Sequence, residues 1–283
     1  MSAHVIKAGP LTTVQDLGRR GQSRLGLSPG GAMDRRALLW ANRLLGNKPG
    51  APALEVTMGG LEVTFDEPTT IAVTGAECSV TVDGESRESW RTLDVLAGQT
   101  LRLGFARSGL RAYVAFPGGL KVASFAGSAS VVLREGLPGS LGRPVSASDV
   151  LHWQTQSLPA SAAPSKGLVP LRFRSAPGSS VAVRFIPAYE WAEFSAEDRA
   201  TLLSAVWTIT PVSDRVACRL EGPALLSGPK VLDSAPLVDG TIQVLADGSP
   251  LIFMRDRPTI GAVSCTLLTL ATPLPLLHLS VPP

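Results

Sequence analysis

Apolar and polar residues alternate with a period of two in several short stretches of the chain. In the clearest run, Leu61–Phe65, every second residue is apolar and the residues between them are polar. Similar alternation recurs at 80–82, 101–105 and 181–185. Because successive side chains of a strand point to opposite faces, this pattern predicts strands with one buried face.

Two Asp-Gly dipeptides mark turns between such stretches. Asp83-Gly84 follows the run at 80–82, and Asp247-Gly248 separates the apolar segments 242–245 and 251–254. Asp-Gly between two apolar runs signals a tight hairpin, because both residues tolerate a positive φ. Many short strands, together with 28 glycines and 23 prolines, predict a mainly β fold of the barrel or sandwich type.

Two other segments have helical spacing. In the first, apolar residues recur on one face between 37 and 45, with Asp34 before the run as a cap and Gly46-Asn47 after it as a stop. The second begins at Ser195, with an acidic residue three positions later as in a capping box. Its predicted apolar face consists of Leu202, Leu203 and Val206.

The two predicted helices lie in different halves of the chain. Between these halves, residues 154–170 are rich in Ser, Ala and Pro and lack periodicity, which indicates a linker. We therefore expect an N-terminal β domain at 1–153 and a C-terminal β domain at 171–283. Each would be a β-barrel carrying one short helix.

Composition indicates a globular protein and argues against several partners. Of the 283 residues, 45% are hydrophobic and 17% are charged, as in proteins with well-buried cores. The net charge is +3, but the basic residues are scattered, so we expect no nucleic-acid partner. We also expect no membrane partner, since no apolar run approaches the ~20 residues that span a bilayer. Three separated cysteines and no apolar leader suit a cytoplasmic protein with reduced thiols.

Familiar catalytic signatures do not occur in the sequence. The three histidines, His4, His152 and His278, are isolated from the cysteines and from one another, so we expect no metal site. A Walker A sequence is not found either. Any chemistry must therefore come from other polar residues.

A loop-rich segment near the start gathers such residues. It combines glycines, an amide, carboxylates and arginine, namely Gln15, Asp16, Arg19, Gly30, Gly31 and Asp34. Glycine lets the backbone approach a ligand closely, and the planar guanidinium suits a carboxylate or phosphate. The alternative is a tight turn, a surface loop and a helix cap without further function.

A second polar set lies in the C-terminal half. Its members are Ser213, Arg215, Arg219, Gln243, Asp256 and Arg257. If both sets converge on a cleft between the domains, Arg215 and Arg257 would clamp a carboxylate or phosphate. The alternative assigns Arg219 with Glu221, and Asp256 with Arg257, to ion pairs at strand edges.

Motifs spread along the chain resemble one family. They are Thr13, Gln15, Asp16, Gly18, Arg19 and Gly21; Gly30–Asp34; Ala37, Leu38, Ala41, Asn42, Leu44, Gly46 and Asn47; Ala53–Glu55; Thr74–Ala76; Arg111–Ala115; Gly118-Gly119; Ser213–Arg215; Arg219–Pro223; Gly240–Val244; and Asp256-Arg257. In this order they resemble the family of 5-oxoprolinase C subunits. That family is also called allophanate hydrolase subunit 2, or the biotin-dependent carboxyltransferase-domain family.

The resemblance implies a fold and a reaction. The fold would be two tandem cyclophilin-like β-barrel domains. The reaction would be the opening of 5-oxo-L-proline, a cyclic amide, to L-glutamate with hydrolysis of ATP. Such a protein would form a hetero-oligomer with a B-subunit homologue, which is kinase-inhibitor-like, and would act with an A-subunit homologue. ATP with Mg²⁺ would be shared with these partners.

The resemblance also assigns roles to the polar sets. Asp16 or Asp34 would act as acid/base groups or contact the metal-nucleotide, and Arg19, Arg215 and Arg257 would contact anions. We take Asp16, Asp34, Arg215 and Arg257 as the catalytic set. Substrate or nucleotide binding would involve Gln15, Arg19, Gly30, Gly31, Ser213, Arg219, Gln243 and Asp256.

Several loops depart from the family pattern and keep other functions open. Where relatives have Thr-Thr-Gly-Gly-Tyr-Pro after Asp-Arg, this chain has Pro258–Ser264, and Pro187–Glu190 and 127–131 also differ. One alternative is a carboxyltransferase-like subunit related to allophanate or urea metabolism. Any biotin would then arrive on a partner, since no Met-Lys biotinylation motif is present. The other is a non-catalytic binding partner or antagonist of a kinase-inhibitor-like homologue.

Overall fold

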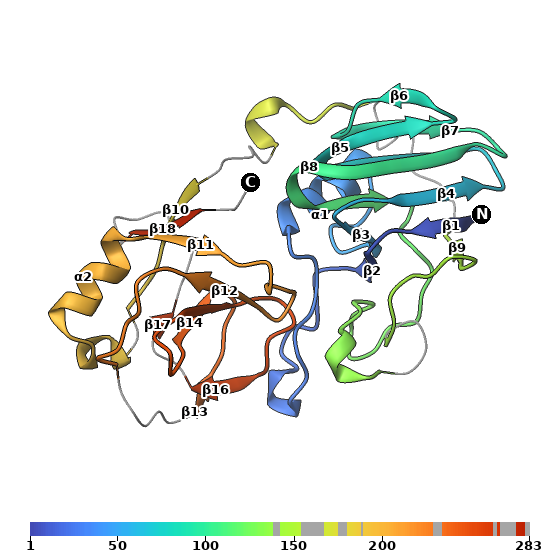
Figure 1. Cartoon of the computed structure of the whole chain (residues 1–283). Coiled ribbons are helices and arrows are strands. Elements are labelled where there is room, and N and C mark those ends of the chain that lie inside the picture. The colour runs from blue at the N-terminus through green and yellow to red at the C-terminus, as the bar shows by residue number, and fades with distance from the viewer. Residues whose placement is uncertain are drawn as a thin grey trace. The chain divides into compact units, whose positions relative to one another are not determined.

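Strands dominate the computed structural model of this chain (Figure 1). It describes residues 1–137, 142–153, 167–174, 180–187, 189–228, 234–262, 265–266 and 276–280. Two α-helices occur among these residues, so the predicted mainly β class is confirmed. The chain divides into two compact units. The first consists of Met1–Arg20 and Gly30–Pro177, and the second of Gly21–Pro29 and Gly178–Pro283.

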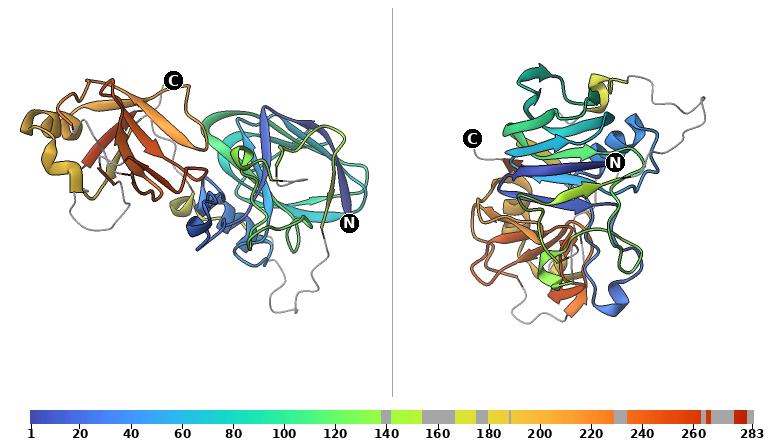
Figure 2. Two further views of the ribbon diagram at one scale, coloured as in Figure 1. Left: turned by 90° about the horizontal axis from the view of Figure 1, so that it is seen from below. Right: turned by 90° about the vertical axis from the view of Figure 1, so that its right-hand side faces the viewer.

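The first unit contains one nine-stranded sheet. The order of its main path is β2-β3-β8-β4-β1-β9, and β5 pairs with β6, β7 and β8. In Figure 2 these strands curl into a partly closed barrel. Their bounds are β1 Ser2–Ala8, β2 Leu11–Gln15, β3 Ala53–Thr57, β4 Leu61–Phe65, β5 Thr69–Val82, β6 Glu85–Arg87, β7 Arg91–Val95, β8 Thr100–Ala115 and β9 Val150–His152.

Helix α1, Arg35–Leu44, lies against β5 and β8 of this unit. Its first turn is capped by Asp34, whose Oδ1 accepts a hydrogen bond from the Ala37 amide at 2.9 Å. The apolar face, including Leu38 and Ala41, is fully buried. The predicted helix, its cap and its end before Gly46 are therefore confirmed.

The predicted alternation holds in part of this sheet. In β4, Leu61, Val63 and Phe65 are buried, and the Asp83-Gly84 turn joins β5 to β6 as predicted. Phe105 is the exception, because it is 67% exposed instead of buried. The β5–β8 pairing shifts register between Glu77 and Val80, close to this position, and the shift breaks the period of two.

The second unit contains a seven-stranded sheet and a separate two-stranded one. Their orders are β10-β18-β11-β12-β15-β14-β17 and β13-β16. The bounds are β10 Ser180–Arg184, β11 Val206–Ile209, β12 Ala217–Glu221, β13 Ser234–Pro236, β14 Thr241–Val244, β15 Pro250–Phe253, β16 Ile260–Ala262, β17 Cys265–Thr266 and β18 Leu276–Ser280. As predicted, the Asp247-Gly248 turn joins β14 and β15.

Helix α2, Ala196–Ser204, belongs to the second unit. The Ser195 hydroxyl accepts a hydrogen bond from the Asp198 amide at 3.0 Å, which confirms the predicted start. Leu202 is buried, but Val206 is 60% exposed, so its assignment to the apolar face of the helix is wrong. The helix ends before this residue, and Val206 instead begins β11. This strand pairs in parallel with β18, and the pairing fixes the course of the chain at Val206.

Residues 154–166 of the predicted linker lie outside the described part of the chain. The next residues contact the first unit: Leu168 forms a bridge with Arg91, and Val169 is buried. The domain limits at 1–153 and 171–283 stay a prediction. None of the described helices has the length and apolarity that a bilayer span requires.

Candidate functional site

Asp16 lies at the centre of a buried hydrogen-bond network in the first unit. It directly follows β2 and is 7% exposed. Its carboxylate accepts hydrogen bonds from Gly18 N at 2.7 Å, Ser128 Oγ at 2.6 Å, Ala129 N at 2.7 Å and Ser130 Oγ at 2.5 Å. Two backbone and two hydroxyl donors thus converge on one carboxylate. The network joins the loop after β2 to the segment 128–130, which sequence reasoning missed.

Arg19 and Gln15 extend this network. The Arg19 side chain is almost fully buried and donates to Ser130 O at 2.6 Å. The Gln15 amide donates to Thr13 Oγ1 at 3.0 Å and to Val131 O at 2.9 Å. Among the described residues, the buried Gln15 Oε1 has no hydrogen-bond partner. A buried guanidinium and a buried amide therefore lie around the same segment as Asp16.

Gly30 and Gly31 bring the second loop against the first. Both have a positive φ, and a Cβ at Gly31 would lie 2.9 Å from the Gly18 nitrogen. A Cβ at Gly30 would lie 3.2 Å from Arg19 Nη1 and closer still to the Val132 side chain. Side chains at either position would push the loops apart. The structure thus brings Gln15, Asp16, Arg19, Gly30 and Gly31 together, whereas Asp34 caps α1.

Glu55 and Tyr113 hold the end of the second loop. Glu55 Oε2 accepts from Met33 N at 2.8 Å and from the Tyr113 hydroxyl at 2.6 Å. That hydroxyl accepts from Asp34 N at 2.8 Å, and Arg111 Nε lies 3.6 Å from Glu55 Oε1. Burial, reinforced by the charge of Glu55, raises the pKa of Tyr113 well above its usual value.

Glu55 and Tyr113 were not predicted as functional residues, although the sequence contains one signal for Glu55. Glu55 is the single charged residue in the apolar run 53–56. A carboxylate inside a strand that is buried on both faces needs dedicated partners, so its position predicts a polar network. The partners themselves, at 33, 111 and 113, are distant in sequence.

Replacement of Tyr113 by phenylalanine is expected to destabilise the first unit by about 1–3 kcal/mol near neutral pH, because Glu55 and the Asp34 amide each lose a buried partner. Thermal unfolding measures the loss. Since folding raises the pKa of this phenol, its contribution should persist below its unfolded pKa and fade as the pH rises above it. A variant as stable as the wild type would contradict the role given to this network.

Arg215 and Asp256 form a buried ion pair in the second unit. The guanidinium donates from Nε and from Nη2 to the two carboxylate oxygens, each at 2.9 Å. The side chains are only 6% and 5% exposed. This bidentate arrangement is the strong geometry for Arg and carboxylate. It differs from the alternative in which Asp256 pairs with Arg257.

Arg257 makes different contacts. It donates to Leu237 O at 3.1 Å and forms an ion pair with Asp239. Burial lowers the pKa of the Arg257 guanidinium, and the charge of Asp239 opposes that shift. Its own carbonyl accepts from the Ser28 hydroxyl at 2.8 Å. Ser28 belongs to Gly21–Pro29, the part of the early loop that lies in the second unit.

The remaining second-half candidates lie on exposed or half-buried positions. Arg219 forms an exposed ion pair with Asp247, and not with Glu221 as in the alternative without a site. Its amide donates to Ser213 Oγ at 3.2 Å. Gln243 lies in β14, opposite Leu251 of β15. The catalytic and binding roles given to these residues, and to those of the first unit, stay predictions.

The contacts limit what the early loop can bind. The amides of residues 32, 33 and 34 donate to Asp16 O, Glu55 and Tyr113 respectively. These three amides are therefore not directed at a phosphate. The amide of Ala37, in the first turn of α1, donates to the Asp34 carboxylate. Across the described ranges, no group of His, Cys, Asp and Glu is arranged to hold a metal ion. The amides of residues 32–34 therefore contribute nothing to a nucleotide-phosphate cradle.

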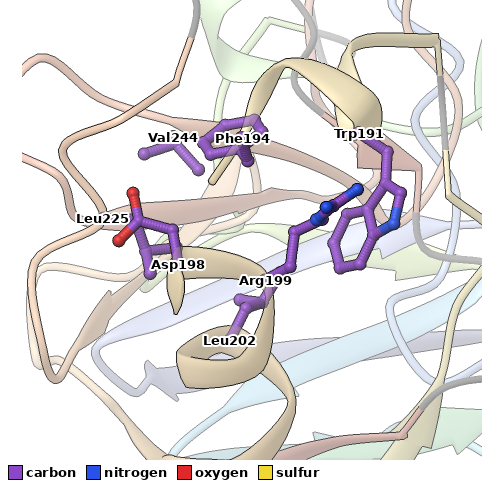
Figure 3. Close-up of a pocket in the computed structure, with 7 residues that line it drawn as sticks. All are labelled: Trp191, Phe194, Asp198, Arg199, Leu202, Leu225 and Val244. Atoms are coloured by element: carbon purple, nitrogen blue, oxygen red, sulfur yellow. The ribbon is translucent and has the colours of Figure 1, made fainter. Parts of the chain in front are cut away.

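A small cavity beside α2 is too restricted for a ligand (Figure 3). Its volume is about 10 Å³, close to the minimum for one water molecule. Its walls are mainly apolar, and the lining residues are Trp191, Phe194, Asp198, Arg199, Leu202, Leu225 and Val244. Asp198 is already bonded to Ser227. The two polar networks, one in each unit, stay the candidate sites.

Comparison with known proteins identifies the family. Residues 25–277 match the family described as "Carboxyltransferase domain, subdomain A and B". The chain belongs to this carboxyltransferase-domain family. The resemblance drawn from the sequence motifs is thereby confirmed.

Two kinds of curated relatives share the carboxyltransferase domain. The chain is 34% identical to the 5-oxoprolinase C subunit of Escherichia coli over 258 residues, which cover 91% of this chain and 81% of that protein. It is 30% identical to urea amidolyase of Saccharomyces cerevisiae over 275 residues, which cover 91% of this chain but 15% of that enzyme. Homologues thus include a named subunit of a hydrolase complex and part of a much larger enzyme.

Solved carboxyltransferase domains have the same fold. The crystal structure of Kluyveromyces lactis urea carboxylase superposes with a TM-score of 0.85 at 26% identity, over 100% of this chain. The chain spans 27% of that protein, and 18% of the urea amidolyase structure from K. lactis, which gives the same TM-score.

Proposed function

We propose that this chain is the C subunit of a 5-oxoprolinase, which opens 5-oxo-L-proline to L-glutamate with hydrolysis of ATP. The observation that carries the proposal is the extent of the match to the E. coli protein. It covers 81% of that protein at 34% identity. The match to yeast urea amidolyase covers 15% of that enzyme, so a urea-related role has less support.

The proposed site combines the two polar networks. On this proposal, Gln15, Asp16, Arg19, Gly30, Gly31 and Asp34 act together with Ser213, Arg215, Arg219, Gln243, Asp256 and Arg257. Within the second unit, Ser28 of the segment Gly21–Pro29 is bonded to the carbonyl of Arg257.

The chemistry of the substrate suits buried arginines. 5-Oxoproline carries a carboxylate, which a guanidinium binds through two parallel hydrogen bonds. Its unstrained amide is a poor electrophile, and transfer of a phosphoryl group from ATP to the amide oxygen would supply a leaving group for hydrolysis. Charge that develops on this oxygen is best stabilised by groups that are already fixed in place. Arg19, Arg215 and Arg257 are fixed in this way by carbonyl and carboxylate partners.

We propose that ATP and Mg²⁺ bind mainly on companion subunits. The amides of residues 32–34 are used within the loop, so this segment contributes no phosphate cradle. In the urea-related alternative, carboxybiotin would likewise come from a partner. In both cases this chain supplies substrate contacts and a binding surface for other subunits.

Reconstitution tests the proposal. Purified chain, mixed with homologues of the A and B subunits from the same genome, is expected to release glutamate from 5-oxoproline only when ATP is present. Omission of this chain should abolish release. Unchanged release without it would contradict the proposal, and ATP-dependent carboxylation of urea with a biotinylated partner would favour the alternative.

A non-catalytic role has one specific observation in its favour. The segment Pro258–Ser264 replaces the family's Thr-Thr-Gly-Gly-Tyr-Pro loop directly after Arg257, one of the proposed site residues. If the chain binds the B-subunit homologue but the full mixture shows no turnover with either substrate, it acts as a binding partner or antagonist of that kinase-inhibitor-like protein.

A further inference from the structure

An open groove lies on the sheet of the first unit, across β1, β4, β5 and β8. These strands are neighbours in Figure 1. The volume of the groove is about 370 Å³. It is lined by Lys7, Gly60, Glu62, Ser79, Thr81, Arg102, Leu103, Gly104 and Phe105. None of these residues belongs to the candidate site described above.

Glycines pack closely beside the groove. A Cβ at Gly104 would lie 2.1 Å from Ser79 Oγ, and one at Gly59 would lie 2.1 Å from Gly104 O, so a side chain at either position would force a shift. At Gly60 a Cβ would make only an ordinary contact with the Phe105 ring, at 3.5 Å, but the positive φ favours glycine. The backbones pack closely at these glycines, which leaves a depression in the surface of the sheet.

A row of charges crosses the groove. Lys7 pairs with Glu62 in the β1–β4 register, and Glu62 pairs with Arg102 in the β4–β8 register. Lys7 Nζ lies 2.7 Å and Arg102 Nε 3.4 Å from the Glu62 carboxylate, and these cations lower the pKa of Glu62, Lys7 most strongly. Two cations on one carboxylate leave the row with one excess positive charge.

Apolar side chains border this row. Phe105 is 67% exposed, and Met58 and Leu110 are each 49% exposed. Backbone hydrogen bonds link Met58 to Leu110 and to Ala106, the residue after Phe105, from Met58 N to Leu110 O at 2.8 Å and from Ala106 N to Met58 O at 2.9 Å. Neighbouring exposed apolar side chains next to charged groups are typical of protein interaction sites, and aromatic residues are frequent anchors there.

We propose that this groove docks a segment of a companion subunit in which a carboxylate side chain lies next to an apolar one. The carboxylate would approach the excess positive charge at Lys7 and Arg102, and the apolar side chain would cover Phe105. An open groove on a sheet face buries too little of a small molecule to hold it, which favours a protein segment. The identity of the partner rests on the proposed function.

Binding of the purified B-subunit homologue, measured by isothermal titration calorimetry, tests this surface. Phe105→Ser and Arg102→Glu are each expected to weaken binding at least tenfold. Lys121→Glu and Leu96→Ser are matched controls, because both positions are exposed and lie outside the groove lining. They should bind within twofold of the wild type. All four side chains are exposed, so melting temperatures should stay unchanged.

Salt gives a second measurement. Rising salt should weaken wild-type binding but should not weaken binding of Arg102→Glu, since the substitution turns the excess positive charge of the row into a negative one and screening then relieves repulsion. Wild-type affinity in both groove variants would overturn the proposal. A loss confined to Phe105→Ser would overturn the carboxylate contact. No binding by the wild type would overturn this inference together with the proposed complex, a result distinct from failure of the groove variants alone.

Discussion

Replacement of Asp16 by alanine is expected to lower the free energy of unfolding of the first unit by roughly 4 kcal/mol. Four donors on residues 18 and 128–130 lose their shared acceptor, and all four lie at buried or half-buried positions. Water cannot replace a buried acceptor without rearrangement of both segments. Urea denaturation followed by circular dichroism measures the loss.

Asp16→Asn serves as the matched control. An asparagine keeps the oxygen that accepts from Gly18, Ser128 and Ser130, but it sets an NH₂ group against the Ala129 amide. We expect about 1–3 kcal/mol of destabilisation, less than for alanine. If both variants unfold within about 1 kcal/mol of the wild type, Asp16 does not organise these loops.

Replacement of Arg215 by methionine should destabilise the second unit by about 3–5 kcal/mol, because Asp256 is left as a buried carboxylate without its bidentate partner. Arg215→Met combined with Asp256→Leu removes both charges and should restore most of the stability. Arg219→Met is the control: its ion pair with Asp247 is exposed, and its loss should leave the free energy of unfolding almost unchanged. Denaturant unfolding measures all three variants.

The double variant also separates structure from chemistry. In the reconstituted enzyme, the Arg215→Met/Asp256→Leu chain should remain inactive although it folds, if Arg215 contacts the substrate. Restored glutamate release would leave the pair a structural role only. A single Arg215 variant that unfolds like the wild type would contradict the burial of this pair.

Local signals in the sequence predicted local structure well. Asp34 and Ser195 cap the two helices because capping involves residues only three positions apart, as the amide donors at 37 and 198 illustrate. The Asp-Gly hairpins were also predicted correctly, because a tight turn depends on residues that are adjacent in the sequence. Phe105 and Val206 were predicted wrongly because a register shift in β8 and the start of β11 depend on distant strands.

The candidate site was predictable to a similar extent. Residues of the two early loops are close in sequence, and they do lie together around Asp16. Their partners at 128–130 are more than a hundred positions away, and no local pattern connects them. The carboxylates that hold the second-half arginines show the same limit. Asp239 and Asp247 each precede a glycine, which signals a turn but does not show which arginine the carboxylate meets.

The division of the early loop between the units has a consequence for synthesis. Ser28 leaves the ribosome 229 residues before Arg257, whose carbonyl it binds. At 5–20 residues per second this interval lasts roughly 10–50 s. During that time the first unit can form its sheet, while Ser28 lacks the Arg257 carbonyl that it later binds. A chain cut at residue 177 would therefore not yield two complete units: the C-terminal fragment would lack a segment made at the very beginning of translation.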